Sequence, residues 1–282
     1  MDLNINETIK SDFKNESFKN FIEESFSPYS SIYFEKGDYV VKTASNWIEV
    51  KKSFELRHKV FFNKEENQKK DRIELEWDEY DYNADHLIIL NKKEDVIGSY
   101  RLISDSFSKN FYTETEFDLN HFKSAVGNKL EIGRACVDTD NRCGIIIDLL
   151  WHGILSYVKK NKIRYIFGVS SVWDKSHEDV FKLQSFLEKN HGDSQFKVKA
   201  AKESFLLESL VDSKKLKSSS LLEINDEKEV MKMTPSLLKG YIRAGAKVCG
   251  PAIYDPVFSC HDFLTILDME SLSSSFKRRY LK

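Results

Sequence analysis

The sequence predicts an α/β fold in which a central mixed, twisted sheet is flanked by helices. The first indication is residues 130–137, LEIGRACV, a short and mostly apolar run typical of a buried strand. A long amphipathic helix is predicted over residues 145–160, and the apolar run 163–169 predicts another buried strand. This order is typical of a crossover between parallel strands. The second indication is an antiparallel hairpin predicted from residues 86–90 and 96–103.

The other elements of the amino-terminal half follow from the spacing of apolar residues. Residues 1–38 carry apolar side chains at helical spacing among charges, which predicts a helical extension. Residues 39–43, YVVKT, predict the first strand. Residues 46–62 predict a helix with Ser45 as its N-cap. We therefore expect one domain over residues 39–282, preceded by the extension.

The carboxy-terminal half is more charged. Residues 174–233 predict a helical, charged insertion in the domain. Thr234 and Pro235 predict the start of the next helix, with Thr234 as the N-cap. Residues 263–267 predict the last strand. Two serine-rich runs predict exposed loops, residues 216–222 and 271–275.

The composition argues against several classes of protein. The 282 residues carry a net charge of -2, which does not suit a general nucleic-acid binder. No apolar run approaches the roughly 20 residues that span a bilayer, and the polar amino-terminus lacks a secretory signal pattern. The cysteines form no CxxC motif and no zinc spacing: Cys136, Cys143, Cys249 and Cys260. We therefore expect a reduced, cytoplasmic environment.

Charged residues inside predicted buried strands are the main functional signal. The strand 130–137 contains Glu131 and Arg134, and the strand 96–103 contains Arg101. A buried charge without a partner is costly, so each must pair with another charge of the protein or with a substrate. A structural ion pair inside the sheet and a substrate site both fit this pattern.

A second concentration of charge lies just before the predicted hairpin. It comprises five acidic residues among aromatic ones: Glu76, Asp78, Glu79, Asp81 and Asp85. The segment is either a solvated acidic turn or a site for a cation, which would be a substrate ammonium group, an arginine or a metal ion. A metal ion is the weaker option, because the segment lacks the glycine and the terminal glutamate of an EF-hand loop.

A set of charged residues occurs in a fixed order along the chain: Arg57, Glu76, Asp78, Asp81, Arg101, Glu131 and Arg134. In order and spacing this set resembles the acyl-homoserine-lactone synthases, GNAT-fold enzymes that acylate an amino-acid amine from acyl carrier protein. The chain is still more similar to the ornithine-lipid family of amino-acid N-acyltransferases. The similar stretches include LRHKVFF, DHLIIL, GSYRLI, LEIGRACV and LLKGYIRAGAKVCGPAIYDP. The resemblance covers residues 39–270.

The resemblance implies a GNAT-like fold and an acyl-ACP-dependent amino-acid N-acyltransferase. Such an enzyme moves a (3-hydroxy)fatty acyl chain to the α-amine of an amino acid, ornithine first, with lysine or glycine as alternatives. The donor would be the acyl-phosphopantetheine of acyl carrier protein, or acyl-CoA, and no permanently bound cofactor is expected. The enzyme would be cytoplasmic, either free or in peripheral contact with the inner face of the membrane. A signal synthase that acylates S-adenosylmethionine and a non-catalytic acyl- or carrier-binding module remain as alternatives.

The residues suggest roles in the aminolysis of a thioester. We expect Glu131 to be the general base, directly or through water, with His86 as its rival and Arg134 beside it. Cys136 lacks an activating partner in the sequence, which makes a covalent thiol route the weaker one. The expected substrate-binding residues are Arg57, Glu76, Asp78, Asp81 and Arg101. The acids would bind the cationic amino acid and orient the arginines, at least one of which would bind the substrate carboxylate.

The donor side is predicted from the loop before the long helix. This loop, NRCGII, lacks the second glycine of a pyrophosphate-binding loop, which favours a carrier-protein donor over acyl-CoA. The expected acyl-donor-binding residues are Arg142, Gly144 and Ser170. No metal site is expected.

Overall fold

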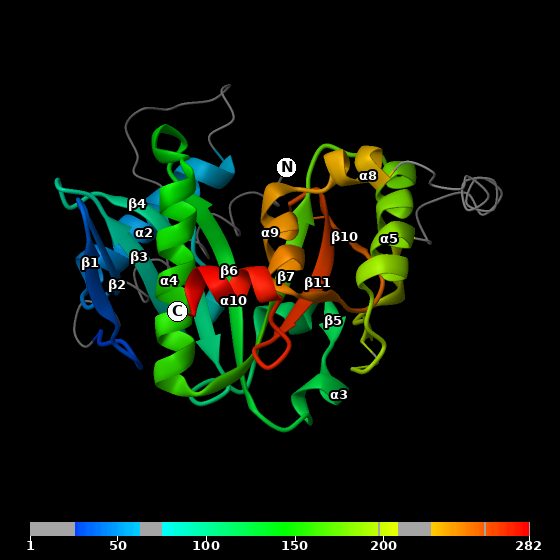
Figure 1. Cartoon of the computed structure of the whole chain (residues 1–282), viewed down its shortest axis with the longest axis horizontal. Coiled ribbons are helices and arrows are strands. Elements are labelled where there is room, and N and C mark those ends of the chain that lie inside the picture. Colours follow the sequence, from blue (N-terminus) through cyan, green and yellow to red (C-terminus); the bar gives the residue numbers. More distant parts are fainter. Residues whose placement is uncertain (1–25, 63–74, 197, 208–226, 257, 282) are drawn as a thin grey trace, which may run out of the picture. The chain divides into compact units, whose positions relative to one another are not determined.

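The computed structural model describes residues 26–281, apart from residues 63–74, 197, 208–226 and 257 (Figure 1). The chain forms two compact units. The first unit combines the described part of residues 1–103 with residues 134–161, and the second combines residues 104–133 with the described part of residues 162–282. Each unit contains β-strands covered by helices, which confirms the predicted α/β class with a mixed sheet.

In the first unit, four antiparallel strands lie side by side in chain order. They are β1 (Tyr33–Lys36), β2 (Tyr39–Thr43), β3 (Asp85–Leu90) and β4 (Val96–Ser104). The second half of β6 (Asn128–Val137) is the next strand beyond β4. The predicted hairpin of β3 and β4 is confirmed, with Ile89 opposite Gly98.

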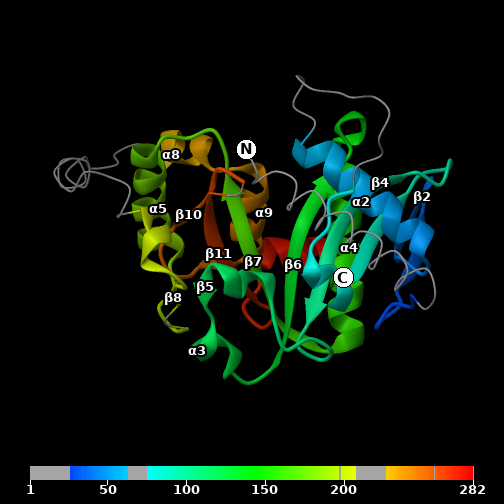
Figure 2. The ribbon, with the colours of Figure 1, turned by 180° about the vertical axis from the view of Figure 1, so that it is seen from behind.

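Helices α2 (Trp47–Phe62) and α4 (Gly144–Asn161) cover opposite faces of these strands, as the two opposite views show (Figure 1, Figure 2). Successive side chains of β3 point to opposite faces of the strands. Ile88 packs in the apolar cluster of α2, and Leu87 packs against α4. A Cβ atom on Gly153 would lie 2.8 Å from Leu87 Cδ1. The missing side chain therefore lets α4 approach the strands closely.

The second unit is built on a mixed sheet in the order β6, β7, β11, β10, with β9 also paired to β11. Its strands besides β6 are β7 (Ile163–Val172), β9 (Lys247–Val248), β10 (Ile253–Asp255) and β11 (Cys260–Asp268). The first half of β6 pairs in parallel with β7, which confirms the predicted parallel pair, whereas β11 is antiparallel to β7 and β10. A separate small sheet pairs β5 (Phe117–Asp118) with β8 (Lys199–Ala200).

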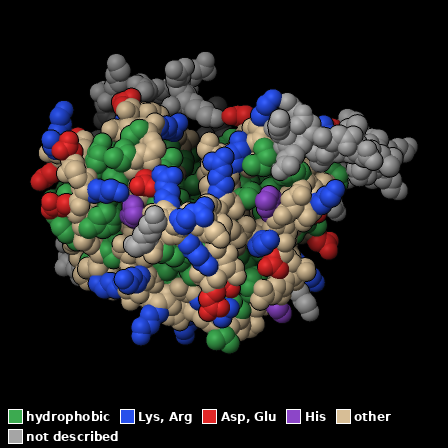
Figure 3. Space-filling model, viewed as in Figure 1, with side chains coloured by type: hydrophobic (Ala, Val, Ile, Leu, Met, Phe, Trp, Pro, Cys, Tyr) green, Lys and Arg blue, Asp and Glu red, His purple; other side chains and the backbone are tan. Residues whose placement is uncertain are grey.

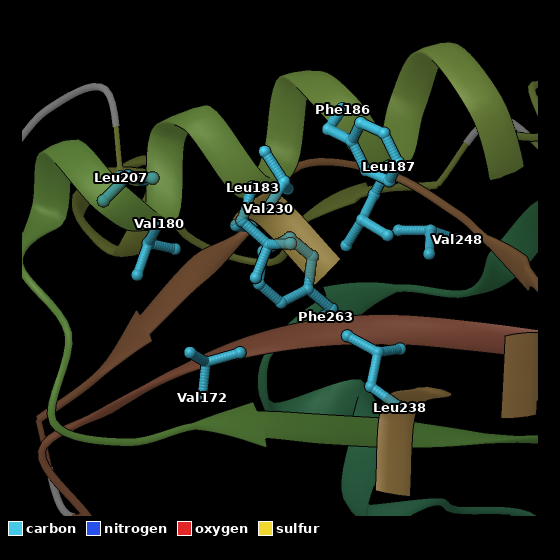
Figure 4. Close-up of a cluster of buried hydrophobic side chains, with 11 residues drawn as sticks. Val172, Val180, Leu183, Phe186, Leu187, Leu207, Val230, Leu238, Val248 and Phe263 are labelled. Carbon is cyan, nitrogen blue, oxygen red and sulfur yellow. The ribbon is translucent and has the colours of Figure 1, made fainter. Parts of the chain in front are cut away.

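An apolar layer joins the helices of the second unit to this sheet. The helices are α3 (Asn120–Lys123), α5 (His177–His191), α8 (Glu227–Met233), α9 (Ser236–Ala244) and α10 (Ser274–Tyr280). Leu183 and Leu187 of α5 lie over Phe263 of β11 in one buried cluster (Figure 4). Leu238 of α9 and Val172 of β7 belong to the same cluster. This face of the sheet is therefore core.

Two predicted N-caps are wrong by one residue each. At α2, Oδ1 of Asn46 accepts a hydrogen bond from the Glu49 amide at 3.0 Å, so Asn46 is the N-cap. Ser45, the predicted cap, donates its amide to the Glu49 carboxylate at 2.7 Å. At α9, the Thr234 hydroxyl donates backwards to a carbonyl of α8 and makes no cap.

Two regions predicted as helical are only partly so. Residues 1–25 lie outside the described residues, and the remainder of the predicted extension contains the strand β1 instead of a helix. Residues 174–233 contain α5 and α8, but also β8 and the 3-10 helix η4 (Glu203–Phe205). The pairing of β8 with β5 makes this region part of a sheet, so a purely helical insertion is wrong.

The serine-rich runs have different outcomes. Residues 216–222 lie outside the described residues. In the run 271–275, Ser273 accepts a hydrogen bond from the Phe276 amide and caps α10, so this run begins a helix.

Lys and Arg side chains gather on the surface over α9 and α10 (Figure 3). On α10 these are the exposed Lys277, Arg278 and Arg279. Across the part of the chain that the structure describes, no helix has both the length and the apolar character needed to cross a membrane.

Candidate active site

Three buried or half-buried arginines of the first unit bind the acidic segment before β3. Arg57 of α2 is 1% exposed and donates to Asp81 through two nitrogens, NH1 to Oδ1 at 2.8 Å and NH2 to Oδ2 at 3.0 Å. Its Nε also donates to Glu76. This two-pronged geometry is the strongest arrangement of a guanidinium with a carboxylate. The predicted residues Arg57, Glu76 and Asp81 are thus brought together, with one another as partners.

Arg134 and Arg101 complete the network. Arg134 of β6 donates from Nε to Glu76 Oε1 at 2.9 Å and from NH2 to Asp78 Oδ2 at 2.7 Å. Arg101 of β4 donates to Asp78 and lies 3.5 Å from Asp81. Three guanidinium groups therefore face three carboxylates. Of the predicted cations for this segment, arginine is the one found.

The acidic segment folds locally so that its carboxylates point inward. Asp78 caps the 3-10 helix η1 (Glu79–Asn83) by accepting from the Tyr80 amide at 2.9 Å. Asp81 returns the contact by accepting from the Asp78 amide at 2.8 Å. This reciprocal capping orients two of the three acids independently of the arginines. The prediction of a solvated turn is therefore wrong for Asp81, which is 2% exposed.

The network sets the charge state of its members. Burial by itself would raise the pKa of Asp81, but Arg57 and Arg101 outweigh it and hold the pKa well below its ordinary value. Burial likewise opposes the charge of Arg57, yet Asp81 and Glu76 raise its pKa above the ordinary value. Arg57 and Asp81 are therefore ionised at neutral pH.

Arg134 has an unusual backbone for a strand residue. Its φ of 50° lies in the left-handed region, which residues other than glycine rarely adopt. The two hydrogen bonds from its guanidinium to Glu76 and Asp78 hold the side chain on the network side. Such a conformation is kept only where the surroundings determine it, and it is common at functional sites.

His86, the rival base, is buried in the first unit. It lies opposite Arg101 in the β3–β4 register, and its ring meets that of Phe54 edge-on at 5.2 Å between centroids. Burial lowers the pKa of His86 to about 4; Asp81 opposes this shift, and Arg57 and Arg101 add to it. Among the described residues, no group bonds to its Nε2. The imidazole is therefore neutral, and a weak base, at neutral pH.

Cys136 on β6 is a poor nucleophile. The thiol is buried, and burial raises its pKa to about 12. It donates to the Arg134 carbonyl at 3.3 Å. A thiol that stays protonated attacks slowly.

Glu131 lies in the second unit, on the first half of β6. It is 3% exposed, and Oε1 accepts two hydrogen bonds from Thr113, from the amide at 3.1 Å and from the hydroxyl at 3.2 Å. Thr113 belongs to the 3-10 helix η2 (Tyr112–Thr115). This carboxylate is thus oriented by two uncharged donors of Thr113.

The paired register of strands β6 and β7 ends directly after Glu131, and we call this point the strand separation. Their parallel register runs from Asn128 with Ile163 to Glu131 with Phe167, where it ends. Gly168 follows, and a Cβ atom there would lie 2.3 Å from the Ile132 carbonyl oxygen. A side chain cannot fit at this position. The separation leaves backbone groups of both strands outside the ladder, next to a fixed carboxylate.

The predicted donor-binding residues lie on different elements of the chain. Arg142 and Gly144 are exposed, between the 3-10 helix η3 (Thr139–Asn141) and α4. Ser170 of β7 is 1% exposed, and its hydroxyl has no hydrogen-bond partner among the described residues. Two residues on, Val172 belongs to the apolar cluster, so Ser170 lies on the core face of the strand.

Sequence reasoning missed a group of buried acids in the second unit. Asp255 and Asp262 lie with Cys260 on β10 and β11, and Glu116 follows η2. Asp255, Cys260 and Asp262 are, within the described residues, a group whose spacing suits a metal ion. The signal was available, because Asp262 opens the apolar run DFLTIL just as Glu131 interrupts LEIGRACV.

Comparisons with known proteins agree with the predicted resemblance. Residues 56–152 match the family model of the acetyltransferase (GNAT) domain. The chain is similar to L-ornithine N(alpha)-acyltransferases of Brucella abortus (28% identity, 86% of this chain and 89% of the relative) and Rhodobacter capsulatus (28%, 86% and 95%). The L-ornithine N(alpha)-acyltransferase of Rhizobium meliloti is 26% identical, over 90% of this chain and 88% of the relative.

Solved structures of two synthases are also similar. The N-acyl amino acid synthase FeeM from uncultured soil microbes has a TM-score of 0.48 and 10% identity, over 85% of this chain and 97% of that one. The acyl-homoserine-lactone synthase LasI has a TM-score of 0.46 and 12% identity, over 87% of this chain and 95% of that one.

Proposed function

We propose that this chain, an acyltransferase of the ornithine N-acyltransferase family, moves a (3-hydroxy)fatty acyl group from acyl carrier protein to the α-amine of ornithine. This would be the first step in making an aminolipid. Lysine and glycine present the same α-amine and are the alternative acceptors. The observation that supports the proposal best is the buried Glu131 carboxylate, held by Thr113 where β6 and β7 separate.

In this proposal Glu131 is the general base. The substrate amine loses a proton to its carboxylate, directly or through water, and the nitrogen attacks the thioester carbonyl. The tetrahedral intermediate then expels the thiolate of the carrier, which takes up a proton, and an amide remains. Thr113 fixes Oε1, so the carboxylate keeps one orientation during proton transfer. His86 is the weaker candidate, because its lowered pKa makes it a poor proton acceptor.

Backbone amides at the strand separation would bind the oxyanion. Donors that are fixed before the reaction stabilise a developing negative charge without reorganisation. The backbone around Ile132 and Gly168 is held by strand pairing up to Glu131 and approaches too closely for a side chain. Holding two substrates in line at such a point supplies much of the rate of aminolysis.

The arginine network acts mainly through orientation. The acids predicted to bind the cationic substrate, Asp78 and Asp81, already bind guanidinium groups. We therefore propose that they and Glu76 hold Arg57, Arg101 and Arg134 in place. The substrate carboxylate would be bound by donors of Arg101 or Arg134, whose planar groups suit it.

The donor proposed is an acyl carrier protein. Arg142 and Gly144 are exposed before α4, and the loop carries one glycine where a pyrophosphate cradle needs more. The site would then bind the pantetheine arm, with Arg142 near acidic groups of the carrier. Ser170 would contact the acyl chain or the arm from its buried position on β7.

The direct test mixes the purified chain with 3-hydroxyacyl carrier protein and one amine at a time. Released carrier thiol is measured with a thiol reagent, and the product is identified by mass spectrometry. Free thiol together with N-acylornithine is the expected result. An acyl-lactone formed from S-adenosylmethionine would assign a signal synthase instead. Carrier binding without thiol release for any amine would assign a binding module.

A further inference from the structure

A group of buried acids in the second unit is not used by the proposed chemistry. Asp255 of β10, Cys260 and Asp262 of β11 each offer an atom within 4.8 Å of the others. The antiparallel register places Asp255 opposite Cys260, so these side chains share one face of the sheet. They alternate with His261 and Phe263, of which Phe263 lies in the apolar core on the other face.

Glu116 faces this group from another part of the chain. It ends η2, is 5% exposed, and its Oε2 has no hydrogen-bond partner among the described residues. The charges acting on its carboxyl are those of Asp262, Asp255 and Glu131, all negative. Burial, followed by these charges, raises the pKa of Glu116 to about 9. Tyr112 donates a hydrogen bond to this carboxyl, but Oε2 is left without a donor, which is rare for a buried acceptor and calls for an explanation, such as a ligand.

We propose that Glu116, Asp255 and Asp262 bind the side-chain ammonium group of the amino-acid substrate. A primary ammonium has three donors and no acceptor, which suits three carboxyl groups converging from two separate segments. Its charge would also relieve the repulsion among them and leave Glu116 ionised. This inference rests on the proposed function, and it makes the acceptor a diamino acid instead of glycine.

The position of the acids relative to the base supports this assignment. Thr113 of η2 holds Glu131, and Glu116 ends the same turn three residues later. Glu131 is also among the charges that act on Glu116. An ammonium bound at the acids would therefore place the α-amine of the same short molecule toward Glu131. One turn thus positions both ends of the substrate.

The chemistry of Cys260 argues against a metal ion as the occupant. Burial raises the pKa of its thiol well above the ordinary value, and Asp262 and Asp255 add to the shift. A metal ion that uses Cys260 would have to displace this proton, because metals bind the thiolate, whereas an ammonium group can bind the carboxyl groups while Cys260 stays protonated.

The test compares L-ornithine with L-norvaline, which has the same carbon skeleton without the ammonium group. We measure kcat/KM for both acceptors with the wild-type chain, Glu116→Gln, Asp262→Asn and the control Asp118→Asn, an exposed residue of β5. The wild type and the control should prefer ornithine by roughly 10- to 100-fold. Each site variant should lose most of this preference, through a higher KM for ornithine, while norvaline is acylated as before.

Calorimetry with L-ornithine, L-norvaline, Ca²⁺ or Zn²⁺ tests the site without catalysis. Ornithine binding that weakens in Glu116→Gln supports the site even if no amine is acylated, in which case only the proposed function fails. Equal acylation of both amino acids by the wild type would overturn the site and leave the function standing. An unchanged ornithine preference in both site variants would also overturn it, as would stoichiometric metal binding that ornithine does not displace.

Discussion

The two units bury carboxylates in opposite ways. In the first unit, Asp81 is held by Arg57 and Arg101, and these partners keep its pKa well below the ordinary value. In the second unit, burial together with the charges of Asp262 and Asp255 raises the pKa of Glu116 to about 9, although Tyr112 donates to its carboxyl. Both residues are almost fully buried, so burial alone does not explain the difference. The presence or absence of guanidinium partners decides it.

This contrast separates two uses of buried charge. A closed set of guanidinium and carboxylate groups already balances its own charges, so it gains less from a charged ligand. A set of acids whose charges repel one another is costly in the free protein and becomes favourable when a cation arrives. The second kind is the better candidate for a ligand site. Four expected effects, from the largest to the smallest, test this contrast between the two sets of buried charges and the docking of the donor.

Removing Arg57 should strongly destabilise the fold of the first unit. In Arg57→Met the side-chain volume is similar, but Asp81 and Glu76 lose their buried partner. Breaking one side of a buried pair costs about 3–5 kcal/mol, so the free energy of unfolding should fall by that amount. Urea denaturation measures it. The control Lys51→Met removes an exposed ion pair on the same helix and should change stability by less than about 0.5 kcal/mol. Equal losses in both variants would show that the network is not structural.

Replacing the base should affect turnover and spare the fold. Glu131→Gln keeps an oxygen that can accept from Thr113, but it removes the proton acceptor. We expect kcat to fall by ~10²-fold or more at unchanged thermal stability. Acyl transfer to the preferred amine measures the first, and circular dichroism on heating measures the second. A variant that folds and retains full activity would exclude Glu131, and one that fails to fold would make its role structural.

Glu116 should make the stability of the chain depend on pH, in the sense opposite to a paired acid. From its ordinary pKa of 4.5 up to about 9, this residue is ionised in the unfolded chain and protonated in the folded one. The folded state binds more protons, so stability is present below pH 4.5 and is lost as the pH rises toward 9. The largest slope that one group can give is about 1.4 kcal/mol per pH unit.

Denaturation of the free protein at pH 6 and pH 8.5 tests this expectation. Glu116→Gln has no such proton to lose, so its stability should fall less than that of the wild type between these two values. Glu203→Gln, an exposed change in the same unit, should behave as the wild type does. The same slope in all three proteins would mean that Glu116 is not held protonated.

The sequence predicted the elements better than the partners. Apolar periodicity gave β3, β4, β6, α4 and β7 nearly to the residue, because burial of one face needs no knowledge of what covers it. Partners depend on tertiary contacts. Arg134 binds Glu76 and Asp78, which lie 58 and 56 residues earlier in the chain, and no local pattern encodes such a meeting.

The buried acids differ in how clearly the sequence marks them. Glu131 stood out because it interrupts an apolar strand, whereas Asp262 begins one and Glu116 lies in a mixed loop. Both became visible only when folding placed them together. The shifted caps have a similar cause, since Ser45 and Asn46 can each bond Glu49 and only the backbone decides which residue begins the helix.

The smallest expected effect concerns the docking of the acyl donor, which depends on exposed charges and on neither set of buried ones. An acyl carrier protein is strongly acidic, so exposed cations near the donor entrance should speed its docking. The sequence offers Arg142 and six lysines of the charged segment as candidates: Lys197, Lys199, Lys202, Lys214, Lys215 and Lys217. Arg142, Lys199 and Lys202 are exposed, and the other four lysines lie outside the described residues. We expect kcat/KM to be higher with the acyl carrier protein than with acyl-CoA of the same chain length.

A salt series and one charge-reversal variant test this expectation. Exposed charges are screened beyond ~8 Å at physiological ionic strength, so the advantage of the carrier should shrink as salt rises. Arg142→Glu should lower kcat/KM for the carrier by about 3- to 10-fold at low salt and leave acyl-CoA nearly unaffected, because steering acts on the encounter with an acidic protein. Lys93→Glu, an equal reversal in the exposed β3–β4 turn, is the control and should leave both donors unchanged. Equal efficiency of the two donors at every salt concentration would show that the missing glycines of the NRCGII loop do not select the donor, and that the exposed charge does no steering.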